Sequence, residues 1–202
     1  MLTLVSSTSD RAPAALHERA LADLQFIRRT MEGAAAFTTL SGAGLVAIGL
    51  SALGAGFLAG STPGPAWLRV WVAEAALALA VGVLATLVKT RRAQLPLLPG
   101  PLRKFGLALA APSLAGAVLT LALAQQGAYA LLPGAWLLLY GSGLLAGGTF
   151  SIRLVPVMGA CFMALGVAGT LAPVALGPAA MVIGFGGLHV LFGTLVVRGH
   201  GG

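Results

Sequence analysis

The chain has 202 residues, of which 58% are hydrophobic and only 8% are charged. Soluble domains average about 45–50% apolar and about 25% charged residues, so this composition excludes an ordinary soluble domain and indicates an integral membrane protein. The formal net charge of +7 would suggest a nucleic-acid partner in a soluble protein. The positions of the basic residues point to the lipid bilayer instead, and no nucleic acid is expected as a partner.

Residues 1–32 form a predicted cytoplasmic segment ahead of the membrane part. Within it, "PAALHERALADLQFIRRTME" places apolar side chains three and four residues apart, as on one face of a helix. We favour an amphipathic helix that lies on the membrane surface. The alternative is a surface that docks a cytoplasmic protein.

Six runs of about 20 apolar residues follow, the length that crosses a bilayer as a helix. Because the runs are continuous rather than alternating, helices are predicted in preference to a β-barrel. The predicted fold class is all-α, a polytopic membrane bundle of six transmembrane helices over residues 33–197, with a cytoplasmic tail at 198–202. The predicted spans are Gly33–Gly60, Ala66–Val88, Phe105–Ala124, Tyr129–Ile152, Val155–Leu176 and Ala179–Val197.

Eleven of the twelve Lys and Arg residues fall on one side of these spans, and only Arg69 lies near the other. By the positive-inside rule both termini are cytoplasmic, which predicts a multi-pass protein of the cell inner membrane. The stretch "KTRRAQLPLLPGPLRK" between the second and third spans is predicted to be an extended loop, because it contains three prolines. Its basic residues are expected to attract anionic lipid headgroups. They are Lys89, Arg91, Arg92, Arg103 and Lys104.

Many of the 29 glycines lie inside the spans. Small residues let helix backbones approach closely in lipid, so a tight bundle is predicted, with Gly143–Gly147 and Gly56–Gly60 as examples. Glycines that line a permeation path are the alternative.

The fourth span resembles the sixth when Trp136 is aligned with Met181. The matched positions are Tyr140-Gly141 with Phe185-Gly186, Gly148-Thr149 with Gly193-Thr194, and Arg153 with Arg198. This pattern predicts three tandem two-helix repeats, related by an axis along the membrane normal. Chance similarity between apolar runs is the alternative.

Two ionisable residues stand out within the spans. Glu74 is the only acid outside the first 32 residues, and His189 is the only histidine within a span. The alignment places both roughly 10–15 Å below the outer surface. A charge near the bilayer centre costs about 2.5–3.5 kcal/mol, so such residues usually face the bundle interior and find partners.

Two interpretations of these residues stay open. In the functional one, Glu74 and His189 form a proton-sensitive binding site. In the structural one, His189 bonds a neighbouring carbonyl, and Glu74 pairs with Arg69 or reaches interfacial water. Secondary binding candidates are Tyr140, Ser142 and Thr194.

Several patterns of catalysis and ligation are missing from the sequence. It contains no phosphate-binding loop with lysine, no paired histidine ligands, no serine nucleophile elbow and no acidic pair within a span. No metal, cofactor or catalytic residue is therefore predicted, and an enzyme is the least favoured class.

Three segments resemble a small family of bacterial six-span membrane proteins of unassigned activity. They are "LQFIRRTMEGAAAFTTLSG", "LPGAWLLLYGSGLLAGGTFSIRLVPVMGACFMALG" and "GFGGLHVLFGTLVVRGHGG". The resemblance implies the topology and a bacterial membrane, and it supplies no reaction.

The leading functional hypothesis is a small transporter or permease with an interior polar site. The alternative is a structural or signalling membrane partner, which docks a cytoplasmic protein through the N-terminal helix and the basic loop. A homo-oligomer is compatible with either.

Overall fold

The computed structural model describes residues 18–28, 41–94 and 100–200. The chain divides into two compact units, residues 1–35 and 36–202, which we describe separately. In the first unit, residues 18–28 form one helix whose side chains are all exposed. The remainder of the predicted N-terminal helix lies outside the described residues.

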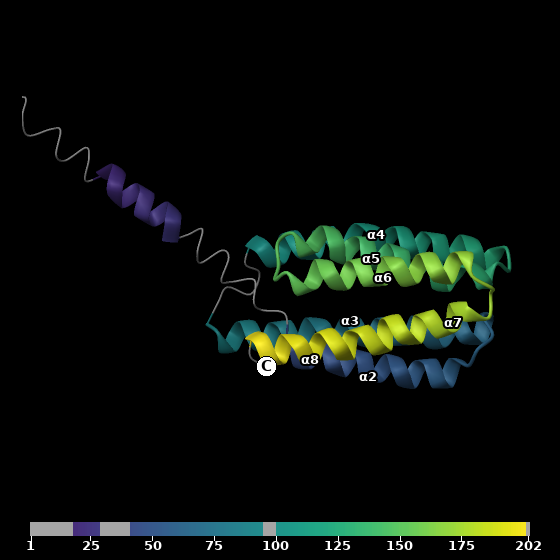
Figure 1. Ribbon diagram of the computed structural model, residues 1–202. Coiled ribbons are helices and arrows are strands. Elements are labelled where there is room, and N and C mark those ends of the chain that lie inside the picture. The colour runs from purple at the N-terminus through teal and green to yellow at the C-terminus, as the bar shows by residue number, and fades with distance from the viewer. Residues whose placement is uncertain (1–17, 29–40, 95–99, 201–202) are drawn as a thin grey trace, which may run out of the picture. The chain divides into compact units, whose positions relative to one another are not determined.

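The described part of the second unit is helical and contains six spans long and apolar enough to cross a membrane (Figure 1). The predicted all-α, six-span fold is therefore confirmed. The first four spans are α2 (Gly42–Ala59), α3 (Pro65–Arg92), α4 (Gly100–Gln125) and α5 (Leu132–Gly148), the last preceded by the 3₁₀ turn η2 (Tyr129–Leu131). The fifth span is α6 (Leu154–Leu171), and the sixth joins α7 (Leu176–Met181), the π-helical segment η3 (Val182–Leu188) and α8 (His189–His200).

The observed helix ends differ from the predicted ones at both sides of the basic connection. α3 continues to Arg92 and α4 begins at Gly100, so the five basic residues lie on helices. The prediction of an extended loop is wrong for them, because Pro101 lies in the first turn of α4, where a missing N–H breaks no helical hydrogen bond. Residues 95–99 lie outside the described residues.

Two other ends also differ from the predicted spans. α2 begins at Gly42, where the Ser41 hydroxyl accepts a hydrogen bond from the Gly44 backbone N–H at 3.1 Å. Residues 33–40 of the predicted first span are outside the described part. α8 continues to His200, so the expected tail begins inside a helix.

The six spans pack as two layers of three helices, which Figure 1 shows side by side. In the first layer α2 packs against both α3 and α8; in the second, α5 packs against both α4 and α6. The chain builds two helices of the first layer, then the whole second layer, and returns to the first with its last span. The two layers meet along α5, α6 and the sixth span.

This arrangement bears on the predicted two-helix repeats. The first two predicted repeats are packed helical hairpins, α2 with α3 and α4 with α5. In the third predicted repeat, α6 packs mainly along α5, whereas α8 packs mainly along α2. The packing therefore does not give three equivalent units, and the repeat stays a prediction.

Glycines lie where helix backbones meet within each layer. A Cβ atom added at Gly49 of α2 would lie 2.7 Å from the backbone nitrogen of Val190 on α8. One added at Gly141 of α5 would lie 2.8 Å from the carbonyl oxygen of Gly159 on α6. Real Cβ atoms do not come so close to backbone, so these two helix pairs require glycine.

The four glycines named as packing examples from the sequence have different surroundings in the structure. Gly143 and Gly147 face side chains of α4, and Gly56 faces Val182. A Cβ atom added at Gly60 would meet no other atom within 4 Å. Gly60 instead ends α2 with a φ of 73°, a conformation that favours glycine.

The described basic residues of this unit, apart from Arg69, lie at one end of the bundle. This end combines the C-terminal end of α3, the start of α4, the turn before α6 and the end of α8 (Figure 1). Lys104 at the start of α4 lies over the ring of Phe150 in that turn, 5.5 Å from its centroid. The charge asymmetry along the sequence is thus an asymmetry between the two ends of the bundle.

Substitution of Gly49 by alanine is expected to destabilise the protein by about 1–3 kcal/mol, because the new methyl group meets the backbone of α8. The measurement is thermal unfolding in detergent. Gly54→Ala on the same helix is the matched control, because no atom lies within 4 Å of its Cβ position. Equal melting temperatures for the two variants would contradict the backbone contact.

Candidate functional site

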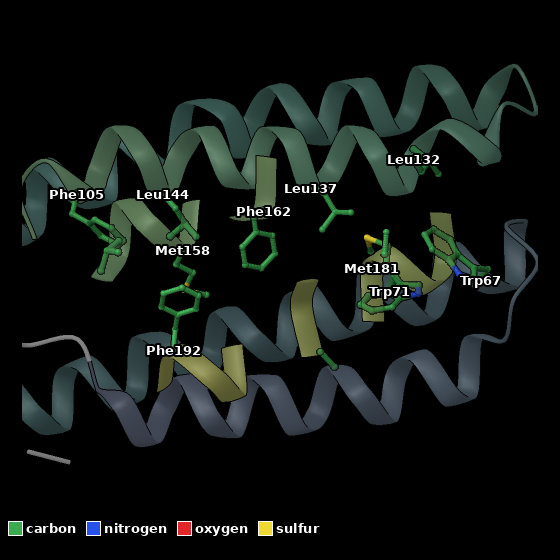
Figure 2. Close-up of a cluster of buried hydrophobic side chains, with 13 residues drawn as sticks. Trp67, Trp71, Phe105, Leu132, Leu137, Leu144, Met158, Phe162, Met181 and Phe192 are labelled. Atoms are coloured by element: carbon green, nitrogen blue, oxygen red, sulfur yellow. The ribbon is translucent and has the colours of Figure 1, made fainter. Parts of the chain in front are cut away.

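The core of the bundle lies between the two layers and is rich in aromatic side chains. Figure 2 shows Phe162 of α6 reaching into the space between the layers, with Leu137 of α5 beside it. Trp67 and Trp71 of α3 lie nearer one end of the same cluster, and all four side chains are buried. Polar groups in this region are therefore shielded from both lipid and water.

One hydrogen bond joins the layers in this core. Nε2 of His189 on α8 lies 2.9 Å from the hydroxyl oxygen of Tyr140 on α5. His189 is only 1% exposed. The ring of Phe185 stacks on the imidazole at 6.1 Å between centroids, and Phe162 meets it edge-on at 5.4 Å. The Tyr140–His189 pair is thus a polar contact enclosed by aromatic rings.

The other ring nitrogen of His189, Nδ1, interacts with the backbone carbonyl groups of Gly184 and Phe185, but neither contact has the geometry of a full hydrogen bond. When Tyr140 donates its proton to Nε2, a neutral imidazole carries its own proton on Nδ1. A buried polar group with poorly aligned partners costs free energy, because such contacts only partly replace its hydrogen bonds to water.

A π-helical segment leads directly into His189. It comprises seven residues, "VIGFGGL", with glycines at three of four consecutive positions. π-helical turns are rare and occur frequently at functional sites, because the wider turn displaces the side chains that follow it. The sequence predictions missed this segment, although the cluster of glycines just before the histidine was its one visible signal.

Glu74 has a different partner. Its carboxylate accepts a hydrogen bond from the Ser51 hydroxyl of α2 at 2.8 Å. No ion pair joins it to Arg69 among the described residues, and Arg69 is exposed. The pairing proposed in the structural interpretation is therefore replaced by a bond between α2 and α3.

Glu74 and His189 lie at comparable depth without being bonded to each other. The rings of Trp71 and Phe185 are 6.1 Å apart, and Glu74 and His189 follow them by three and four residues. Each nevertheless has its own partner, Ser51 within the first layer and Tyr140 across the layers. In the described part of the chain, Glu74 and His189 therefore belong to two separate polar contacts.

The two remaining candidates bond their own helices. Ser142 donates to the carbonyl of Leu139 at 2.8 Å, and Thr194 donates to the carbonyl of Val190 at 2.7 Å. Such local bonds satisfy a hydroxyl donor without a partner from another helix. Of the three secondary candidates, Tyr140 is the one that the structure brings to His189.

The chemistry open to this site is hydrogen bonding and proton binding. Among residues 18–28, 41–94 and 100–200, no three His, Cys, Asp or Glu side chains come together as a metal site would require. Tyrosine and histidine both donate and accept hydrogen bonds, and histidine titrates most readily near neutral pH in water.

Six apolar spans around a buried polar pair define a polytopic membrane helix bundle. Comparison of the chain with protein-family models, with curated proteins and with solved structures gives no match.

A double-mutant cycle with Tyr140→Phe and His189→Leu is expected to show a coupling free energy of about 0.5–3 kcal/mol, because the two side chains share a hydrogen bond. The measurement is the free energy of unfolding in detergent.

The matched cycle combines Tyr140→Phe with Glu74→Gln, whose partners differ. It should be additive within about 0.5 kcal/mol. Strong coupling in this second cycle would place Glu74 in the same site, as the sequence first suggested.

Proposed function

We propose that this protein is a small transporter or permease of a bacterial inner membrane, in which the Tyr140–His189 pair is the central polar site. The observation that carries the proposal is the position of this pair. It is buried between the two layers, and Nδ1 of His189 makes no well-aligned hydrogen bond.

The cost of burial supports a functional role. An apolar pair of similar size would pack between the layers without any unsatisfied atom. Ionisable residues within membrane spans commonly mark pathways for substrates, ions or protons. His189 is such a residue, and 1% of its surface is exposed.

The interrupted sixth span supports the same function. Transporter sites often lie near the bilayer midplane beside helices with irregular backbone, because such segments change conformation at low cost. Here η3 provides that irregularity immediately before His189. The other helices of the two layers are continuous through the same region, apart from Pro112 within α4.

In the proposed cycle, the two layers shift relative to each other around the central pair. The Tyr140–His189 bond favours the closed arrangement seen here. Protonation of His189 at Nε2 reverses this bond, so that Nε2–H donates to the Tyr140 oxygen and the Tyr140 proton becomes free to bond the substrate. Glycine contacts within each layer let the layers move as units.

The proposed orientation places the basic end of the bundle, and with it both termini, in the cytoplasm. Lys and Arg residues near span ends determine orientation in bacterial membranes. The same end then faces anionic lipid headgroups, which attract each basic residue by about 1 kcal/mol.

The test uses proteoliposomes that contain a pH-sensitive dye and receive a panel of weak acids, amines, amino acids, sugars and inorganic ions. At least one class is expected to change the internal pH faster than in protein-free liposomes. His189→Leu and Tyr140→Phe should lower that rate about tenfold or more, in line with the loss of a positioned proton-transferring group.

Ser142→Ala is the control, because the Ser142 hydroxyl bonds only its own helix. It should transport at the wild-type rate. If no solute class gives a protein-dependent signal with folded protein, the transporter proposal is wrong.

One observation favours the alternative, a membrane partner for a cytoplasmic protein. The helix at residues 18–28 exposes large apolar side chains, among them Leu24 at 62% and Ile27 at 51%. Exposed apolar residues on a helix face are typical of surfaces that bind a membrane or another protein.

The double variant Leu24→Asp, Ile27→Asp is expected to lose any protein that co-purifies with the wild type, because two charges oppose burial of this face. Affinity purification from the native membrane measures this. Ala22→Asp is the control for added charge alone. An unchanged set of co-purifying proteins would exclude docking through this helix.

A further inference from the structure

Two other buried donors lie in the same core. The indole nitrogens of Trp67 and Trp71 have no hydrogen-bond partner, and the two residues are 1% and 3% exposed. Their rings are adjacent, with centroids 5.9 Å apart. In Figure 2 the two nitrogens lie at neighbouring edges of the rings.

The third tryptophan of the chain has a hydrogen-bond partner for its indole nitrogen. Trp136 lies 6.3 Å from Trp67, and its indole nitrogen donates to the Thr120 hydroxyl at 2.8 Å. Buried tryptophans generally have such a partner. The same aromatic cluster therefore contains one satisfied indole and two unsatisfied ones, one helical turn apart on α3.

The missing partner of these indoles is an acceptor. An indole nitrogen only donates, and Nδ1 of His189, which is poorly aligned with its carbonyl neighbours, is a further donor in the Tyr140-donating tautomer. Glu74, the one carboxylate of the described spans, is bonded to Ser51. The core thus offers more buried donors than acceptors, which suits a ligand that carries oxygen acceptors and no donors.

We propose that Trp67 and Trp71 bind the carboxylate of a small monocarboxylate with an apolar body. This inference rests on the proposed transport function and gives its substrate class. The two carboxylate oxygens match two N–H donors one turn apart. Hydrogen bonds to a charged acceptor are also stronger than those to a neutral one.

The side chains around the indoles are apolar and aromatic, as the body of such a ligand would be. Trp71 contacts Phe185 at 6.1 Å between centroids, and Phe185 stacks on His189. The indole pair therefore adjoins an aromatic surface that leads to the Tyr140–His189 pair. A carboxylate at the indoles and a proton on His189 together add no net charge to the core, which lowers the cost of carrying the anion through lipid.

The probe is radiolabelled benzoate, whose binding to the purified wild-type protein in detergent is measured by equilibrium dialysis against a micelle-only background. Saturable binding is expected. Each of Trp67→Phe and Trp71→Phe keeps an aromatic ring but removes one donor, and should weaken binding about tenfold. Trp136→Phe is the matched control and should bind within about twofold of wild type, because its donor is already satisfied by Thr120.

Toluene competes as a neutral analogue of the apolar body and should displace benzoate only weakly. If benzoate does not bind saturably to folded wild-type protein, or if the double variant Trp67→Phe, Trp71→Phe binds it unchanged, the carboxylate site is wrong. Unchanged binding by the double variant would mean that the two indole N–H groups bond water instead of the carboxylate.

Uptake of benzoate by proteoliposomes separates this site from the transport function. Binding that needs both indoles, without uptake, supports the site and overturns the transporter proposal. Uptake of another solute that depends on His189, with no benzoate binding, overturns the site and leaves the transporter proposal intact.

Discussion

The close approach of helix backbones at glycines determines the rest of this structure. α2 meets α8 at Gly49, and α5 meets α6 at Gly141, at distances that exclude any side chain. In lipid there is no hydrophobic force between helices, so such contacts supply much of the association energy through packing. They hold each layer together from within and leave larger side chains to fill the space between the layers.

The interface between the layers consequently differs from the contacts inside them. Inside a layer, small residues let backbones touch. Between layers, side chains make the contacts: aromatic rings such as Phe162 and Phe185 surround the Tyr140–His189 hydrogen bond, and Gly184 faces the side chains of Leu137 and Phe162. A contact made of side chains rearranges more readily than one made of backbone, because rotamers change without breaking helices. The interface is therefore the part of the bundle best suited to movement, and the unsatisfied donors lie there as well.

The sequence predicted the spans well and the site only in part. Long apolar runs allow few structures in lipid, so the six helices and the uneven distribution of charge followed directly from composition and order. The helix ends were predicted less well: Pro101 favoured a loop, although it lies in the first turn of α4. A proline has both roles, and only the neighbouring residues decide between them.

The partner of His189 was not predictable from depth alone. Any polar residue at the same depth on one of the other helices is a candidate partner for His189. Which of them lies within reach depends on the layer that the last span joins. That depends on the matching of glycine faces, such as Gly49 with Val190, which the separate runs do not reveal. The π-helical turn was missed for a related reason, because a glycine-rich run is equally compatible with an α-helix.

The return of the last span to the first layer has a consequence for biosynthesis. α2 emerges from the ribosome before the other spans, but its partner α8 is made after them. Until then, the glycine face of α2 has no backbone to contact and must be covered by lipid, by a translocation component or by a transient neighbour. The second layer, whose three helices are consecutive, can form in the meantime. A chain cut short before the sixth span therefore leaves α2 without the helix whose backbone it contacts most closely.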